Sequence, residues 1–177
     1  MKQIGILGGS FNPPHLGHTA IAHYVLAQGN VEQVWVLPCW QHPFEKELAP
    51  FEDRLAMCQL AFADQKNVEV LDLERTLGGV SFTLRTVQTL QKKFPDSSFS
   101  LIVGEDAYQE RNLWHGIKEL EKLVQWICIP RGKNSPIPDV SAKEIRHILA
   151  EGKSATLALA PTILQYIRQH HLYSIKN

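Results

Sequence analysis

The sequence predicts an α/β fold in which helices cover both faces of one doubly wound parallel sheet. Two observations predict this class: short apolar runs alternate with segments of helical periodicity, and the apolar runs are continuous instead of half polar. Continuous runs are typical of parallel strands, which are buried on both faces. The 177 residues contain no internal repeat and no low-complexity segment, so we expect residues 1–177 to form a single domain.

Five apolar runs are expected to form the strands of the sheet. They are Gln3–Leu7, Val34–Leu37, Val68–Leu71, Phe99–Val103 and Val124–Ile129. Four of them are followed directly by a residue that ends a buried strand, namely Gly8, Pro38, Gly104 and Pro130. The alternation of these runs with helices indicates a Rossmann-like sheet.

Helical spacing of apolar side chains indicates helices between and after these strands. The expected ranges are His18–Gln28, Phe51–Ala63, Thr83–Phe94, about Gly116–Leu123, a segment that ends at Ala150, and a last helix from near Pro161 to around His171. Ser81 is a candidate cap for the third helix, and Ser141-Ala-Lys-Glu144 is a capping box that opens the fifth. Lys133–Val140 contains two prolines and is expected to be a loop. The last two helices form a C-terminal helical segment.

Charge and cysteine content argue against several classes of protein. Eighteen basic and eighteen acidic side chains cancel, so we expect no nucleic-acid partner. No apolar stretch approaches the ~20 residues of a membrane span, and the N-terminus lacks the apolar segment of a signal peptide. Cys39, Cys58 and Cys128 are widely spaced and form no C-x-x-C pair. We expect them to be core cysteines of a cytoplasmic protein, without a disulfide or a zinc site.

The segment after the first strand has the composition of a phosphate-binding site. In a doubly wound sheet, ligands bind beyond the carboxyl ends of the strands. Gly8 and Gly9 let backbone amides approach a phosphate closely, and Ser10 adds a hydroxyl donor. His15 and His18 are three residues apart and share one face of a helical turn. At a helix N-terminus their imidazoles could donate to phosphate oxygens.

Other readings of this segment are less consistent with the sequence. A dinucleotide oxidoreductase would have G-x-G-x-x-G here, and a P-loop would have Gly-Lys-Ser/Thr, but the chain reads G-G-S-F-N-P. The two histidines could also be surface residues or metal ligands. A metal site would need a third protein ligand, and none is obvious nearby, so we expect no metal held by the protein itself.

Gly8–His18, GGSFNPPHLGH, resembles the signature of the H-x-G-H nucleotidyltransferase superfamily. Within that superfamily the chain resembles the bacterial nicotinate-nucleotide adenylyltransferases from end to end. The further matching segments are Phe51–Met57, Leu73-Glu74 with Gly79–Thr83 and Thr86, Ile102–Asp106 with Trp114, Pro130–Gly132, Val140-Ser141 with Ile145-Arg146, and Tyr166-Ile167 with Leu172-Tyr173.

The resemblance implies transfer of AMP from ATP to nicotinate mononucleotide, with release of pyrophosphate, in NAD synthesis. It implies that His15 and His18 hold the ATP phosphates and that Ser141 and Arg146 contact the triphosphate. The backbone lining the same pocket would come from Gly8, Gly9, Ser10 and Phe11. His15, His18, Lys46 and Arg146 are the candidate catalytic residues, acting on the leaving pyrophosphate together with Mg²⁺. That ion is usually held mainly by phosphates and water.

The resemblance also implies an acceptor site for a pyridine mononucleotide. Asp106 would form a hydrogen bond with the acceptor ribose, and Trp114 would stack on the pyridine ring. Arg131 lies in the segment that corresponds to the P-R-P/G turn of the family. The segment that would meet the pyridine carboxylate is Ser81, Phe82 and Thr83.

Departures from the family leave the acceptor open. His42–Lys46 replaces the usual P-P-H-K, with Lys46 still expected to reach a phosphate and His42 a candidate for the family histidine. Ala142 and Lys143 replace a serine and a threonine, and Lys143 could supply a cation; Arg85 replaces a common aspartate. The alternatives are the same chemistry on nicotinamide mononucleotide, phosphopantetheine or FMN, and a non-catalytic ATP-binding protein. A homo-oligomer also stays open.

Overall fold

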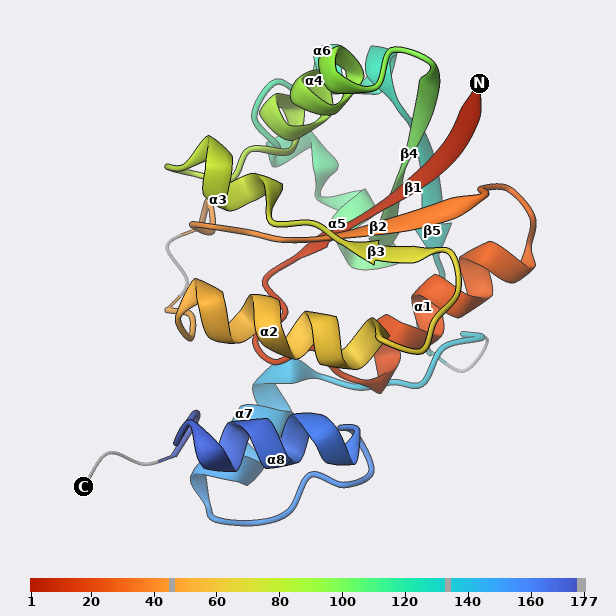
Figure 1. Ribbon diagram of the computed structural model, residues 1–177. Helices are drawn as coiled ribbons and strands as arrows, with labels where there is room; N and C mark the ends of the chain where they lie inside the picture. The colour runs from red at the N-terminus through yellow and green to blue at the C-terminus, as the bar shows by residue number, and fades with distance from the viewer. Residues whose placement is uncertain (45–46, 133–134, 175–177) are drawn as a thin grey trace.

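A five-stranded parallel sheet forms the centre of the computed structural model, which describes residues 1–44, 47–132 and 135–174 (Figure 1). The strands are β1 (Lys2–Gly9), β2 (Gln33–Pro38), β3 (Val68–Val70), β4 (Ser97–Gly104) and β5 (Gln125–Ile129). Their order is β3-β2-β1-β4-β5, and all four pairings are parallel. The order of the chain reverses between β1 and β4, as in a doubly wound sheet. The predicted fold class is confirmed.

Helices cover both faces of this sheet. They are α1 (Leu16–Ala27), α2 (Phe51–Phe62), α3 (Leu73–Leu77), α4 (Thr83–Lys93), α5 (Glu105–Gln109), the 3-10 turn η1 (Arg111–Leu113), α6 (Ile117–Leu123), α7 (Ala142–Ala150) and α8 (Pro161–Gln169). In Figure 1, α4 and α6 lie on one face, α1 and α2 lie on the other, and α7 and α8 lie beyond α2.

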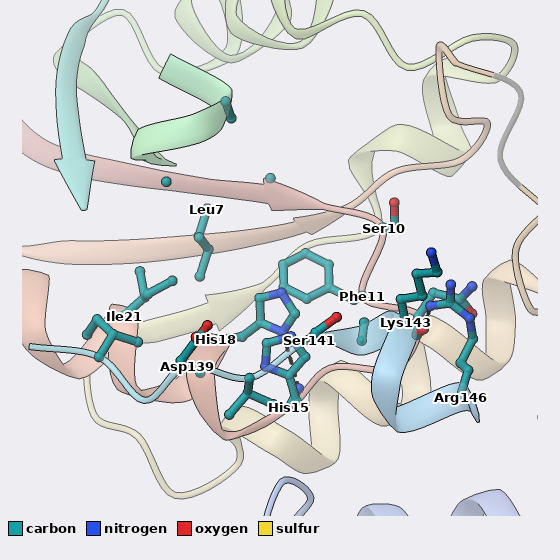
Figure 2. Close-up of a pocket in the computed structure, with 18 of the residues that line it drawn as sticks. Leu7, Ser10, Phe11, His15, His18, Ile21, Asp139, Ser141, Lys143 and Arg146 are labelled. Atoms are coloured by element: carbon teal, nitrogen blue, oxygen red, sulfur yellow. Dashed lines mark hydrogen bonds between the residues drawn. The ribbon is translucent and has the colours of Figure 1, made fainter. Parts of the chain in front are cut away.

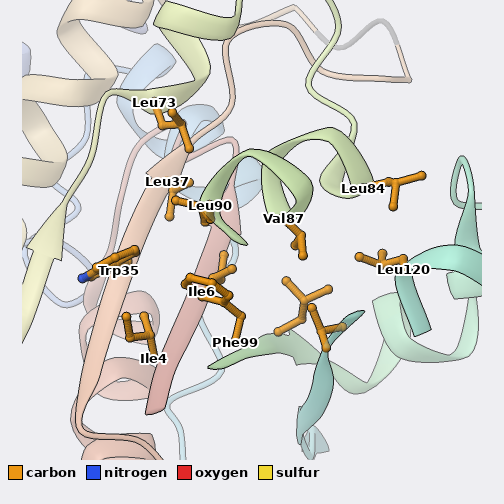
Figure 3. Packing of buried hydrophobic residues seen from close by; sticks show 12 residues of the cluster. Ile4, Ile6, Trp35, Leu37, Leu73, Leu84, Val87, Leu90, Phe99 and Leu120 are labelled. Atoms are coloured by element: carbon orange, nitrogen blue, oxygen red, sulfur yellow. The ribbon is translucent and has the colours of Figure 1, made fainter. Parts of the chain in front are cut away.

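Alternation along the strands divides the core between the two faces. Ile4 and Ile6 of β1 point to the α4–α6 side, where they belong to a cluster with Val87 and Leu120 (Figure 3). Leu7 points to the other side, into a cluster with residues of α1 and α2. Successive side chains of a strand point to opposite faces, so an unbroken apolar run serves both clusters.

The C-terminal helices are attached through α2. Met57 of α2 is fully buried in a third cluster with Ile145 of α7 and Ile163 and Ile167 of α8. The opposite side of the same helix contributes Cys58 and Phe62 to the sheet cluster. Helix α2 therefore lies between the sheet and the C-terminal segment and packs against both.

Two local predictions were wrong. Ser81 does not cap α4, because Phe82 is the N-cap residue and Ser81 Oγ accepts a hydrogen bond from the Trp40 amide at 2.9 Å. Cys128 is exposed instead of buried, because it lies on the edge strand β5, which has a neighbouring strand on one side only. Ser141 does cap α7, with its Oγ accepting from the Glu144 amide.

The short helices α3, α5 and η1 were not predicted, since three to five residues are too few to display a helical period. The expected loop 133–140 has neither helix nor strand over residues 135–140, and 133–134 lie outside the described residues. None of the helices in the described parts of the chain combines the length and the apolar character needed to cross a membrane.

Candidate active site

A cavity of about 1270 Å³ opens at the carboxyl end of the sheet. Its walls come from the ends of β1, β4 and β5, from the first turn of α1, from α7, and from residues 171–174 after α8. The strands β1 and β4 are neighbours at the point where the strand order reverses. A crevice at that point is the usual ligand site of doubly wound sheets.

The cavity brings together many of the residues singled out in the sequence. Those that line it are Gly8, Ser10, Phe11, His15, His18, Trp114, Arg131, Ser141, Lys143 and Arg146. The lining does not include Gly9, His42, Asp106 or the segment 81–83. Lys46 lies outside the described residues.

The two histidines form a stacked pair at the start of α1. Their ring centroids are 3.7 Å apart, and the His15 amide donates to His18 Nδ1 at 3.2 Å. Phe11 packs against His18 with a centroid distance of 4.8 Å (Figure 2). A Cβ at Gly17 would lie 3.0 Å from the His15 ring, so only glycine fits between the two histidines without a shift.

Burial keeps the histidine pair neutral. Burial first, and then the nearby Arg131 guanidinium, together lower the pKa of His15 from 6.5 to about 4. The pKa of His18 is well below its usual range, because of burial first and then of the charges of His15 and Arg131. His15 Nδ1 is buried and has no hydrogen-bond partner within the described residues. A buried polar atom without a partner is consistent with a site made for a polar ligand.

Arg146 is held against the loop that follows β1. Its Nη1 donates to the Asn12 carbonyl oxygen at 2.7 Å. The Asn12 side chain is buried, and its Oδ1 accepts from the Tyr173 hydroxyl at 2.8 Å and from the Ala49 amide at 3.1 Å. Burial raises the pKa of Tyr173, which keeps its hydroxyl a neutral donor. Asn12 therefore joins the phosphate-loop candidate to α7 and to the C-terminal segment.

Asn12 and Tyr173 belong to the site, although in the sequence they stand only as letters of longer motifs without a predicted role. The signal that could have singled out Asn12 is its position between the glycine pair and the first histidine. Tyr173 gave no such signal, since its contact with Asn12 spans almost the whole chain.

The basic residues of α7 lie at one end of the cavity. Figure 2 shows Lys143 and Arg146 there, Leu7, Ile21 and Asp139 on the far side, and the histidine pair between them. The basic end suits the anionic part of a ligand.

The expected acceptor residues are only partly assembled. Trp114 lines the cavity and packs against Trp126 with a centroid distance of 5.7 Å. Arg131 Nε lies 3.4 Å from Asp106 Oδ2, and both side chains are largely exposed. The Ser81 amide donates to the Gln41 carbonyl oxygen, so that segment lies beside the loop after β2.

No group of three or more histidine, cysteine, aspartate or glutamate side chains that could hold a metal ion occurs within residues 1–44, 47–132 and 135–174. The carboxylates that line the cavity are Glu47 and Asp139. A metal ion at this site would need most of its oxygen ligands from phosphates and water.

The family model described as cytidylyltransferase-like matches residues 6–148 of the chain. The chain therefore belongs to the cytidylyltransferase-like family, which is the class of protein that the fold and the cavity define.

Curated relatives narrow the class. The chain is 39% identical over 181 residues to "Probable nicotinate-nucleotide adenylyltransferase" of Anaeromyxobacter dehalogenans (strain 2CP-C), covering 97% of both chains. It is 35% identical to the protein of the same name from Myxococcus xanthus (strain DK1622), covering 98% of this chain and 96% of that one. The chain belongs to the nicotinate-nucleotide adenylyltransferase family, whose members are nucleotidyltransferases.

A solved structure agrees on the fold. Plasmodium falciparum nicotinic acid mononucleotide adenylyltransferase, complexed with NaAD, superposes with a TM-score of 0.83 at 21% identity, covering 98% of both chains.

Proposed function

We propose that the chain transfers AMP from ATP to nicotinate mononucleotide, forming nicotinate adenine dinucleotide and pyrophosphate as a step of NAD synthesis. The observation that carries the proposal is the stacked pair of His15 and His18 facing the same cavity as Arg146 and Lys143. Relatives at 35–39% identity over nearly the whole chain bear the name of this reaction.

The reaction needs little from the protein in the way of acid or base. The acceptor carries a phosphate whose oxygen is already nucleophilic at neutral pH. What remains is to align that oxygen with the α-phosphorus of ATP and to stabilise the charge that develops on the leaving pyrophosphate.

We assign the second task to the histidine pair and the basic residues around it. A neutral imidazole keeps one N–H donor, so His15 and His18 can each donate to a phosphate oxygen without carrying a charge. Arg146 adds a planar cation at the end of the cavity where α7 begins. Lys46 is assigned to the leaving pyrophosphate as well, because of its position in the sequence. Ser141 and the backbone from Gly8 to Phe11 would complete the phosphate pocket.

For the acceptor, Trp114 is the best supported assignment, because its ring lines the cavity. Asp106 would bond the ribose, and to do so it would exchange its ion pair with Arg131 for the ribose hydroxyls. The 81–83 backbone and Arg131 remain assigned to the acceptor. Mg²⁺, held mainly by phosphates and water, would neutralise part of the charge of the triphosphate. The widely spaced cysteines support a cytoplasmic location.

The test is pyrophosphate release from ATP, with nicotinate mononucleotide and nicotinamide mononucleotide as parallel acceptors, with Mg²⁺ or with EDTA. We expect Mg²⁺-dependent release with the acid form. Release with the amide form alone would keep the chemistry and change the acceptor. Binding of ATP without release from either acceptor would contradict a pyridine mononucleotide as the acceptor, and it would leave another phosphorylated acceptor or a non-catalytic ATP-binding protein. Release that EDTA leaves unchanged would remove the metal from the proposal.

A further inference from the structure

Arg54 of α2 is the largest fully buried side chain of the described residues, with 1% of its surface exposed. A buried guanidinium is costly unless its N–H groups are satisfied. Yet no carboxylate of residues 1–44, 47–132 or 135–174 forms an ion pair with it. A leucine or methionine would fill the same volume without that cost, so the charge calls for a reason beyond packing.

The partners of Arg54 are backbone carbonyl oxygens from three separate segments. Its Nε donates to Ala49 at 2.9 Å, its Nη1 donates to Ser10 at 2.9 Å and to Cys39 at 2.8 Å, and its Nη2 donates to Trp40, the residue after Cys39, at 3.4 Å. Ser10 follows β1, Cys39 follows β2, and Ala49 precedes α2. The planar fork of donors thus joins the two loops at the carboxyl end of the sheet to the helix beneath them.

The bond to Ser10 sets the direction of one peptide group in the candidate phosphate loop. In a trans peptide the C=O and the following N–H point in opposite directions. Because the Ser10 carbonyl points at Arg54, the Phe11 N–H points away from Arg54. Both Ser10 and Phe11 line the cavity. No acceptor among the described residues takes up that N–H. An amide without a protein acceptor beside a cavity can donate to an anion bound there.

The conformation that Arg54 holds is strained. Phe11 has a φ of +47°, in the left-handed region that side chains other than glycine rarely adopt. Such a residue persists only where its surroundings fix it, and strained backbone of this kind gathers at ligand sites. One residue further on, the Asn12 carbonyl oxygen accepts from Arg146. The strained segment therefore lies between the two arginines that hold it.

We propose that Arg54 is a positioning residue for the triphosphate: its guanidinium fixes the Ser10–Phe11 peptide so that the amide donates to a phosphate of ATP, and so that Asn12 holds Arg146 in place. This inference rests on the proposed function for the identity of the ligand. Arg54 itself never touches the nucleotide. The role requires the fork of donors and not only the positive charge.

The test compares three replacements of Arg54 with a matched control. Arg54→Met keeps the volume, Arg54→Lys keeps the charge without the fork, and Arg54→Ala leaves a cavity. Arg75→Met is the control, because Arg75 is an exposed arginine of α3 whose ion pairs among the described residues are with Glu52 and Asp72 only. The readouts are the Kd of α,β-methylene-ATP by calorimetry, KM and kcat for both substrates, and the thermal unfolding midpoint.

We expect folded Arg54→Met and Arg54→Lys to bind the analogue at least about tenfold more weakly, and kcat/KM for ATP to fall by about 10²-fold. The KM for the acceptor should stay within about twofold, because a purely structural defect would not select one substrate. Guanidinium ion at tens of millimolar should restore part of the activity of Arg54→Ala. Urea, which has the same shape without the charge, should not, and Arg75→Met should respond to neither.

Wild-type affinity for the analogue in folded Arg54→Met would overturn the proposal. If the methionine and alanine variants do not fold, Arg54→Lys decides, and wild-type affinity there would overturn it as well. Wild-type protein that binds the analogue but releases no pyrophosphate would contradict the proposed function alone. The analogue's affinity for the variants would still test Arg54.

Discussion

The buried histidine pair should make the stability of the folded protein depend on pH in a way that can be traced to His15. Unfolding restores the pKa of this imidazole from about 4 to 6.5, so between these values the unfolded chain binds the proton and the folded protein does not. Because folding lowers the pKa of this imidazole, the folded protein loses stability as the pH falls through 6.5.

The size of the effect follows from those two values. At pH 7 both states are mostly deprotonated at His15, and the penalty is near zero. At pH 5 the unfolded imidazole is protonated and the folded one is not, which costs about 2 kcal/mol of unfolding free energy. The loss would approach its full value only below the folded pKa of about 4.

Urea unfolding at pH 7 and pH 5 measures this loss in the wild type and in His15→Asn. Asparagine is a good N-cap residue, so α1 should still form. The variant should lose about 2 kcal/mol less than the wild type between the two pH values, whatever its absolute stability. His23→Asn, at an exposed site of the same helix, should keep the wild-type loss. Equal losses in wild type and His15→Asn would refute the reasoning, since His15 would then titrate alike in both states.

Three further predictions concern other parts of the molecule. Gly116→Ala should destabilise the fold by about 2 kcal/mol or more, because its φ is +68° and the added Cβ would lie 2.3 Å from Leu84. The control Gly152→Ala, with a φ of +71° and open space around it, should cost only about 1 kcal/mol. Equal shifts of the thermal unfolding midpoint in the two variants would contradict a steric clash at Gly116. Cys128 should react rapidly with a thiol reagent in the native state while the two buried cysteines do not, so three fast thiols would refute the burial pattern. His18→Ala should lower kcat for pyrophosphate release by ~10²-fold or more if the imidazole acts as a donor to the leaving group, and unchanged turnover would exclude it.

Local sequence determined the parts of the fold that a short window can display. The five runs became the five strands, with small shifts at their ends. The central strands β1, β2 and β4 are buried over most of their length and are mainly apolar, whereas the edge strands β3 and β5 are partly exposed and include polar residues such as Glu69. The glycine between the histidines was visible as a letter of the motif, and its reason is steric, since a side chain there would meet the His15 ring. The phosphate-site candidates from Gly8 to His18 could be predicted together because they form one continuous segment of the sequence.

Tertiary structure decided what depends on contacts between distant segments. The bond from Tyr173 to Asn12 and that from Arg146 to the same residue join the two ends of the chain, and no local pattern encodes them. Burial decided the protonation of the histidines, because the loss of hydration that lowers the pKa comes from the whole surrounding fold. The sequence identified Arg54 as one letter of a helical motif. The carbonyl oxygens that explain its buried charge come from three separate segments, and only the folded chain brings these segments together at one edge of the sheet.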